Sequence, residues 1–361
     1  MKKIPYRNLM KIASAVLALG VMSACGGSPA PASSAAPAPA PASSAAPAAP
    51  ASSAAPASSS EAAPADAAPL PGGGSNIIYI LTPSTSNAFF KTEADTCSAK
   101  AVELGYEAKA FSHDDDAASQ SDLFDQAIAD KAAAIICDNA GADATIEAVQ
   151  RARDAGIPTF LIDREINQSG VAISQIVANN DQGAAAIAEA WVEAMGEKGK
   201  YAELLGLETD TNCHVRSDAF HRVIDQYPDL EMVAQQSANW DQTEGYSKTE
   251  AILQQNPEIT GIICGNDTMA CGAAQACIDA GRDDIKIIGV DGSDDAASYI
   301  KKGQMVGTAL QQCALISEMA VQQADDYLKN GTTGLEEKQL VDCIAITSEN
   351  VDNLSAFVYK G

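Results

Sequence analysis

The sequence predicts an α/β protein made of two doubly wound parallel-sheet lobes joined by a hinge. From residue 76 onward, short apolar runs alternate with helix-like amphipathic segments, which is typical of repeated β-α-β units with right-handed crossovers. Residues 76–361 form a stretch of a length that usually folds into two domains, each with its own hydrophobic core. A weak internal repeat also indicates two halves, because Ala134–Asn139 resembles Gly261–Asn266 and each closes a strand before a helix.

Ten apolar runs are expected to form strands. Several of them are β-branched and bounded by Gly, Pro or Asp, as parallel strands buried on both faces should be. The runs are Ile77–Leu81, Glu107–Phe111, Ala133–Cys137, Thr159–Ile162, Gln175–Ala178, Tyr201–Leu207, Met232–Gln236, Ile259–Cys264, Ile285–Val290 and Val306–Leu310.

The segments between these runs have helical periodicity. They lie near residues 88–104, 117–131, 143–155, 181–196, 213–227, 241–255, 267–281, 293–302 and 313–330. Ligands of doubly wound sheets bind at the carboxyl ends of the strands, so two facing sheets predict a ligand site in the cleft between the lobes.

The N-terminus has the pattern of an export signal. Four basic residues precede the apolar stretch Ile12–Val21, which is too short for a comfortable membrane span. Met22–Cys25 then resembles the lipobox of bacterial lipoprotein signals, in which the Cys becomes the lipidated N-terminus. We therefore expect residues 1–24 to be a signal peptide and Cys25 to carry lipid on the extracytoplasmic side of the cell membrane. The alternative is an ordinary signal peptide in which Cys25 has no special role.

Residues 25–75 are expected to be a linker. They consist almost entirely of Ala, Pro, Ser and Gly, and the unit Pro-Ala-Ser-Ser-Ala-Ala-Pro begins at Pro31, Pro41 and Pro50. Such a tract lacks the large apolar side chains whose burial would offset the entropy of ordering it. We expect a partly extended spacer that holds the folded part away from the membrane.

Charge and cysteine content narrow the function classes. From Cys25 onward the chain has 19 Lys and Arg against 48 Asp and Glu, a formal charge of −29, which disfavours nucleic acid and anionic membrane as partners. Eight further Cys lack C-x-x-C spacing, so no zinc site is expected, and buried free thiols are favoured over disulfides, which the sequence cannot assign. They are Cys97, Cys137, Cys213, Cys264, Cys271, Cys277, Cys313 and Cys343.

Nothing in the chain predicts an enzyme. There is no G-x-S-x-G elbow, no P-loop and no G-x-G-x-x-G motif after the first strand, so no cofactor is expected. The three histidines, His113, His214 and His221, are interpreted as surface or cleft-lip residues. The charge run Asp114–Asp116 is interpreted as a solvated helix cap rather than a metal site.

Polar and aromatic side chains are concentrated just after the predicted strands. Each placement alone is weak, because an Asn or Asp after a strand is usually a helix cap. Together they put a set of groups where a cleft ligand would lie. The candidate ligand-binding residues are Asn87, Phe89, Phe90, Asp163, Arg164, Asn212, Arg216, Trp240, Asn266, Asp291 and Gln311.

Nine of these eleven residues lie in six motifs that follow one another in a fixed order along the chain. The motifs are Asn87–Phe90, Leu161–Arg164, Arg216–Phe220, Gly265–Ala270, Gly289–Gly292 and Gln311. In this order and spacing, residues 76–350 resemble the ribose-binding-protein branch of the periplasmic sugar-binding proteins, type I fold. The chain departs from that pattern at Ala88, at Val290 and in the polar segment 208–212. It also departs at Trp240, because ribose binders carry Phe there.

The resemblance implies two lobes that are each built from separate stretches of chain. The N-terminal lobe would comprise residues 76–178 plus 312–340, and the C-terminal lobe residues 179–311 plus 341–361. The strand crossings near 178, 311 and 340 would form the hinge.

The resemblance also implies a substrate-binding lipoprotein of an ABC-type sugar importer. It would act as a monomer and deliver its ligand to a permease with its ATPase. The residue types fit a sugar, because Asp and Asn accept from hydroxyls, Arg donates, and aromatic rings cover C–H faces. Two Asp, 163 and 291, against two Arg, 164 and 216, balance in charge and predict a neutral monosaccharide or polyol.

Three other functions are alternatives to this one. A sensor that presents a sugar or autoinducer-2 to a chemoreceptor or kinase would keep the same fold. A sugar-responsive repressor would need an N-terminal helix-turn-helix and a basic face, which the chain lacks. An enzyme would need a nucleophile and base, and no such set is present.

Overall fold

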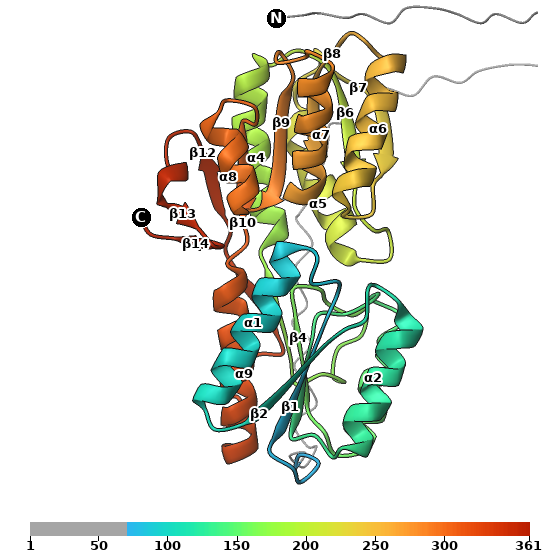
Figure 1. Ribbon diagram of the computed structural model, residues 1–361, viewed down its shortest axis with the longest axis vertical. Helices are drawn as coiled ribbons and strands as arrows, with labels where there is room; N and C mark the ends of the chain where they lie inside the picture. The colour runs from blue at the N-terminus through green and yellow to red at the C-terminus, as the bar shows by residue number, and fades with distance from the viewer. Residues whose placement is uncertain (1–70) are drawn as a thin grey trace, which may run out of the picture. The chain divides into compact units, whose positions relative to one another are not determined.

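A computed structural model describes residues 71–361, and two six-stranded sheets form its framework (Figure 1). The predicted signal peptide, the lipidation site at Cys25 and the linker up to residue 70 lie outside the described residues. The predicted α/β class with two doubly wound, mainly parallel sheets is confirmed.

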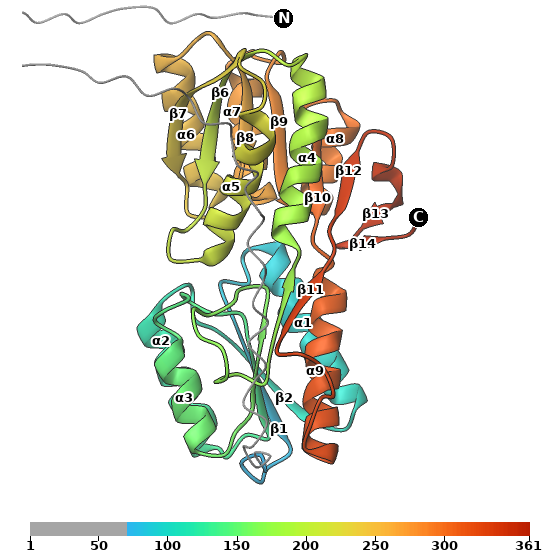
Figure 2. The ribbon, with the colours of Figure 1, turned by 180° about the vertical axis from the view of Figure 1, so that it is seen from behind.

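The first sheet has the strand order β11-β5-β4-β3-β1-β2 and is entirely parallel. Its strands are β1 (Ile77–Thr82), β2 (Glu107–Ser112), β3 (Ala134–Cys137), β4 (Thr159–Ile162), β5 (Ser174–Ala178) and β11 (Lys338–Val341). Helices α1 (Ala88–Glu103) and α9 (Cys313–Asn330) cover one face, and α2 (Ala117–Ala129) and α3 (Ile146–Asp154) cover the other (Figures 1 and 2). We call this sheet and its helices the first lobe.

The second sheet has the order β12-β10-β9-β8-β6-β7, in which only the β10–β12 pair is antiparallel. Its strands are β6 (Gly199–Leu205), β7 (Leu230–Ser237), β8 (Ile259–Cys264), β9 (Lys286–Asp291), β10 (Gly307–Leu310) and β12 (Ile344–Thr347). Helices α4 (Asn180–Met195) and α5 (Thr211–Ile224) pack on one face, and α6 (Gln242–Gln255), α7 (Asp267–Asp279) and α8 (Asp294–Lys301) on the other. This sheet and its helices form the second lobe.

The last four strands were not predicted from the sequence. Besides β11 and β12 they include the hairpin β13 (Leu354–Ser355) and β14 (Val358–Tyr359), which follows a short 3₁₀ turn at Val351–Asn353. These segments are two to four residues long and partly exposed, so they lack the continuous apolar run that marks the central strands.

The chain passes between the two sheets three times, and hydrogen bonds tie the passages together. The amide of Asn179 donates to the carbonyl of Val341 at 2.7 Å. The Gln182 side chain accepts from the Cys343 amide at 2.9 Å, and the Gln312 side chain donates to the Asp342 carbonyl at 2.9 Å. The three connections therefore form one bonded junction rather than three independent strands.

All eight cysteines within residues 71–361 are free and buried, as expected. Burial raises the pKa of the Cys97 thiol to about 12, with a similar effect at Cys343, so these groups are neutral members of the core. In the part of the chain that the structure describes, no helix combines the length and apolarity needed to cross a membrane.

Candidate functional site

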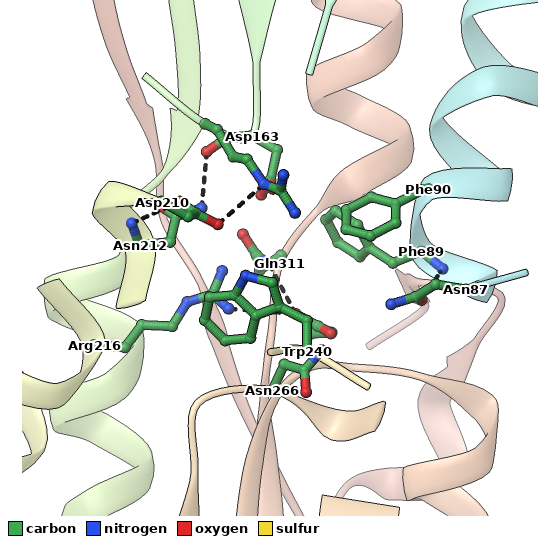
Figure 3. A pocket seen from close by; sticks show the side chains of 12 residues that line it. Asn87, Phe89, Phe90, Asp163, Asp210, Asn212, Arg216, Trp240, Asn266 and Gln311 are labelled. Carbon is green, nitrogen blue, oxygen red and sulfur yellow. Dashed lines mark hydrogen bonds and ion pairs between the residues drawn. The ribbon is translucent and has the colours of Figure 1, made fainter. Parts of the chain in front are cut away.

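One cavity at the carboxyl ends of the two sheets brings the predicted residues together (Figure 3). All eleven sequence-predicted ligand residues line it, and one residue that was not predicted, Asp210, lines it with them.

The first lobe contributes an aromatic pair and a charged pair. Asn87 caps α1 by accepting from the Phe89 amide at 2.9 Å, and this places Phe89 and Phe90 in the first helical turn at the cavity. The two rings meet edge to face, with centroids 5.7 Å apart. Asp163 and Arg164 follow β4 directly, and Asp163 has a left-handed backbone with φ of 56°. The Arg164 guanidinium lies 5.1 Å from the centre of the Phe90 ring.

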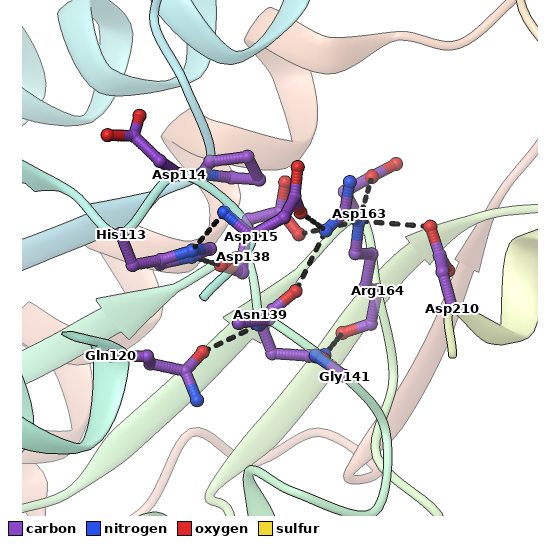
Figure 4. Close-up of polar contacts among 12 residues, drawn as sticks. His113, Asp114, Asp115, Gln120, Asp138, Asn139, Gly141, Asp163, Arg164 and Asp210 are labelled. Atoms are coloured by element: carbon purple, nitrogen blue, oxygen red, sulfur yellow. Dashed lines mark hydrogen bonds and ion pairs between the residues drawn. The ribbon is translucent and has the colours of Figure 1, made fainter. Parts of the chain in front are cut away.

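Four carboxylates surround Arg164 (Figure 4). The nearest nitrogen–oxygen distances are 2.6 Å to Asp115, 3.0 Å to Asp210, 3.4 Å to Asp138 and 3.9 Å to Asp163. These carboxylates raise the pKa of Arg164 against the opposing effect of burial. Asp115 was predicted to belong to a solvated cap, and that is wrong for this residue, because the buried guanidinium draws it into an ion pair. The neighbouring Asp116 does cap α2, as expected.

The second lobe holds Arg216 in an equally fixed position. Its Nε donates to the Asn180 side chain at 2.7 Å, and Nη1 donates to the Gly265 carbonyl at 3.0 Å. The same nitrogen lies 3.7 Å from Asp291. The guanidinium lies 5.4 Å from the centre of the Trp240 ring, within the range of a cation–π interaction. Arg216 is therefore oriented before any ligand arrives.

Trp240 fits the cavity wall because two glycines leave room for its ring. A Cβ atom at Gly206 would lie 2.0 Å from Cζ2 of Trp240, and one at Gly265 would lie 2.9 Å from Cζ3. The residue is in the left-handed region with φ of 63°, and only 6% of it is exposed. Its indole Nε1 is buried and has no hydrogen-bond partner within residues 71–361.

Asn266, Asp291 and Gln311 complete the second-lobe wall. Asn266 lines the cavity and also caps α7, because its side chain accepts from the Met269 amide at 2.9 Å. Asn87 likewise both caps a helix and lines the cavity. Asp291 ends β9 and accepts from Nε2 of Gln311 at 2.9 Å. The other polar atom of this side chain, Oε1 of Gln311, has no hydrogen-bond partner among the described residues.

Residues 208–212 of the second lobe touch the first lobe directly. Nδ2 of Asn212 donates to the Asp163 carbonyl at 3.1 Å, Asp210 pairs with Arg164, and the Ala142 amide donates to the Thr209 carbonyl at 3.1 Å. The cavity is therefore closed over by contacts between the lobes. Asp210 was missed because no motif marks it, although the unusual polarity of this segment was visible in the sequence.

The predicted balance of two Asp against two Arg is incomplete, because Asp210 adds a third carboxylate to the cavity. Three carboxylates line the cavity, from Asp163, Asp210 and Asp291, against the two guanidiniums. Burial raises the pKa of Asp163 to about 6 and raises that of Asp291 well above its usual range. The net charge of the cavity thus depends on where protons lie, and a count of Asp and Arg does not fix it.

One of the three histidines is not at the surface. His113 is buried; its Nε2 donates to the Asp138 carbonyl at 2.7 Å, and Nδ1 accepts from the Asp115 amide at 3.2 Å. Burial lowers its pKa, so it is a neutral support for the loop that carries Asp115. His214 is exposed, as expected, and His221 is half-buried beside Glu203, which raises its pKa to about 9.

The fold and the cleft site agree with comparisons to known proteins. A family profile described as a periplasmic binding protein domain matches residues 78–333. The chain belongs to the periplasmic binding protein family. A D-apiose import binding protein of Actinobacillus succinogenes is 56% identical over 284 residues, which cover 78% of this chain and 92% of that protein. A protein of the same description from Paraburkholderia graminis is 52% identical, covering 79% of this chain and 92% of that protein.

More distant relatives and solved structures lie in the same family. A ribose import binding protein of Bacillus subtilis is 31% identical, covering 70% of this chain and 81% of that protein. The crystal structure of an ABC transporter periplasmic solute-binding protein of Actinobacillus succinogenes with bound D-allose aligns with a TM-score of 0.73 and 28% identity. The alignment covers 77% of this chain and 99% of that structure.

The predicted kinship with ribose-binding-protein-like sugar-binding proteins is thereby confirmed. The chain is a substrate-binding protein for ABC-type sugar import rather than an enzyme, and a sensor role is not favoured.

Proposed function

We propose that this protein binds D-apiose, or a neutral sugar of closely similar shape, in the cavity between its lobes and delivers it to an ABC permease with its ATPase. The observation that carries this proposal is a set of buried polar atoms without partners in the cavity-lining residues. Oδ1 of Asp163 and Oε1 of Gln311 can accept, and Nε1 of Trp240 can donate. A hydroxylated ligand would satisfy atoms of both kinds, and leaving such atoms unpaired is costly.

The composition of the wall supports a neutral ligand. Asp163, Asp210 and Asp291 offer carboxyl oxygens to which the hydroxyl groups of a neutral sugar can donate. Phe89, Phe90 and Trp240 provide apolar surface for the C–H faces of a sugar ring. The name of the sugar comes from the two relatives at 56% and 52% identity, which are D-apiose import binding proteins.

Closure of the lobes would accompany binding. We take the first lobe as residues 76–178 plus 312–340 and the second as 179–311 plus 341–361, a division supported by the pairing of β11 with β5 and of β12 with β10. A ligand that touches both lobes shifts the protein toward the closed form by its differential affinity for that form. The permease would then recognise the closed, loaded monomer.

The test of ligand identity is a thermal-shift and calorimetry screen of the purified protein. The probes are D-apiose, D-ribose, D-allose, myo-inositol and xylitol. A ligand at a hundredfold excess over its Kd stabilises the native state by about 2.7 kcal/mol, and we expect D-apiose to give the largest shift. Arg216→Ala should abolish it, whereas Arg222→Ala, on an exposed face of the same helix α5, should not. No shift with any neutral sugar would contradict the proposal.

Membrane attachment rests on the sequence around Cys25. We propose that this residue is lipidated and holds the mature protein on the extracytoplasmic side of the cell membrane. Cys25→Ser should release the protein into the medium or leave an unprocessed precursor. A Cys25→Ser variant that is processed and still fractionates with membranes would show that lipidation is not the anchor.

A further inference from the structure

Glu93 is a buried carboxyl group that neither the fold nor the sugar site explains. It lies in α1, one turn after Phe89 and Phe90, and is 0% exposed. Neither of its oxygens has a hydrogen-bond partner within residues 71–361, and none of the ion pairs in this part of the chain includes it. An ionised carboxylate in such surroundings would be highly unfavourable, because it would have neither water nor a cation nearby.

Two other carboxyl groups converge on Glu93 from the first sheet. Asp138 follows β3 and Asp163 follows β4, and one oxygen from each of the three residues lies within 4.8 Å of the others. Asp138 is 0% exposed, and both of its oxygens also lack hydrogen-bond partners among the described residues. Asp163 in turn lines the sugar cavity, so Glu93 lies directly behind the site.

Among the described residues, two guanidiniums act on this cluster: Arg164, and Arg216 of the second lobe, which acts on Asp163. Nε of Arg164 is 3.4 Å from Asp138 and 3.9 Å from Asp163, but Arg164 also serves Asp115 and Asp210 (Figure 4). Three ionised carboxylates beside these two shared guanidiniums would leave an uncompensated negative charge in the core. A proton on one of them removes that charge and also supplies the missing hydrogen-bond donor.

We propose that the Glu93 carboxyl group is protonated at neutral pH and donates a hydrogen bond to the Asp138 carboxylate. Through this hydrogen bond it positions Asp138 and Asp163 for ligand binding. The positioning role rests on the function proposed above, while the protonation does not. Glu93 is a positioning residue, because it does not line the cavity itself. Glu93 is the better proton holder because Asp138 and Asp163 face Arg164, whose charge favours their ionised forms.

The electrostatic surroundings favour a proton within this cluster. Burial raises the pKa of Asp138 well above its usual range, although the charge of Arg164 opposes that rise. Burial, followed by the charges of Asp138 and Asp163, raises the pKa of Glu93 well above its usual range. The other titratable groups that face it include the thiols of Cys97 on the same helix, Cys137 at the end of β3 and Cys313 on α9, which burial keeps neutral. None of these neighbours supplies a positive charge to Glu93.

A bound metal ion is the competing explanation, because three carboxylates could also hold a cation. Arg164 argues against it, since its guanidinium already lies within 4 Å of two of the three carboxylates and would repel a second cation. The proton explanation needs no group beyond those of the chain. The experiment below separates the two.

The test compares the wild type with Glu93→Gln, Glu93→Leu and the control Glu103→Gln, which alters an exposed carboxylate on the same helix. Without sugar, the Tm of the wild type should fall as pH rises from about 5 to 8, because the folded protein holds a proton that the unfolded chain releases. Glu93→Gln should flatten this decline and raise the Tm at pH 8, since an amide needs no proton to donate. Glu103→Gln should follow the wild-type profile.

Sugar affinity at neutral pH tests the positioning role. We expect Glu93→Gln to bind the best sugar from the ligand screen within about threefold of the wild type, and Glu93→Leu, which leaves Asp138 without its donor, to bind about tenfold or more weakly. If the wild type binds no sugar, the proposed function fails, while the Tm profiles still test whether Glu93 is protonated.

The protonation is overturned if Glu93→Gln keeps the wild-type decline of Tm with pH or is less stable than the wild type at every pH. It is also overturned if millimolar Ca²⁺ or Mg²⁺ raises, and EDTA lowers, the Tm of the wild type but not that of Glu93→Gln. Equal affinities of all three Glu93 forms would overturn the positioning role.

Discussion

The tight fit of Trp240 against Gly206 predicts that one added methyl group will damage the sugar site. A Cβ at residue 206 would lie 2.0 Å from Cζ2, 2.1 Å from Cη2 and 2.2 Å from Cε2 of the indole. Ordinary carbon–carbon contact is about 3.5–4.0 Å, so the ring must move by about 1.5 Å or more. Gly206 has no positive φ, so the clash alone, and not backbone strain, is the perturbation.

The expected magnitude comes from what the ring loses when it moves. Overpacking costs about 1–3 kcal/mol. Displacement from Arg216, now 5.4 Å from the ring centre, forfeits a cation–π interaction of about 0.5–2 kcal/mol. If half of this total, about 0.8–2.5 kcal/mol, falls on the closed, loaded form, the Kd of Gly206→Ala should rise by about fourfold to seventyfold.

The assay is calorimetry of four proteins: the wild type, Gly206→Ala, Trp240→Phe and the double variant. A Phe ring lacks the outer indole atoms that face Gly206, so it leaves space for the methyl group. We expect the double variant to bind better than the sum of the single changes predicts, with a coupling of about 1 kcal/mol or more. Wild-type affinity in Gly206→Ala, or strict additivity in the cycle, would refute the argument that this glycine exists to admit Trp240.

Two further predictions concern the cavity charges and the closure of the lobes. Arg164→Ala should weaken sugar binding by well over tenfold, because it leaves several buried carboxylates without their cation at a cost of about 2–5 kcal/mol. Arg164→Lys should recover only part of this affinity, since the lysine ammonium group lacks the planar fork of a guanidinium. Normal affinity of Arg164→Ala in calorimetry would contradict the site. Tryptophan fluorescence should change on sugar addition through Trp240, which lines the cavity, and not through the fully buried Trp191, so a response that survives Trp240→Phe unchanged would place the signal elsewhere.

The central strands and the residues that line the cavity could be predicted from the sequence for a physical reason. Buried parallel strands such as β4 and β8 are continuous apolar runs, and their ends are marked by a change to polar residues. In parallel sheets those ends meet at one edge, so Asp163 after β4 and Asn266 after β8 could be assigned to a common cleft without coordinates.

The parts that could not be predicted depend on distances between segments far apart in the chain. Asp210 is recognisable only once the second lobe lies against Arg164. Asp115 looked solvated because its run of three acids gives no sign that a buried guanidinium lies beside one of them. Glu93 occupies a helical position where a polar residue suggests a surface, and only the packing of α1 on the sheet shows that it is enclosed.

The three passages between the sheets have a consequence for biosynthesis. The first sheet is completed by β11 at Lys338–Val341, and its outer helix α9 spans Cys313–Asn330, so the lobe that begins at β1 needs residues made almost last. Domains made of one contiguous stretch can fold as they leave the ribosome, N-terminal part first. Here neither half can be finished until nearly all of the chain is present. Synthesis of almost the whole chain therefore precedes the completion of either sheet, so the native two-lobed fold is completed late relative to translation.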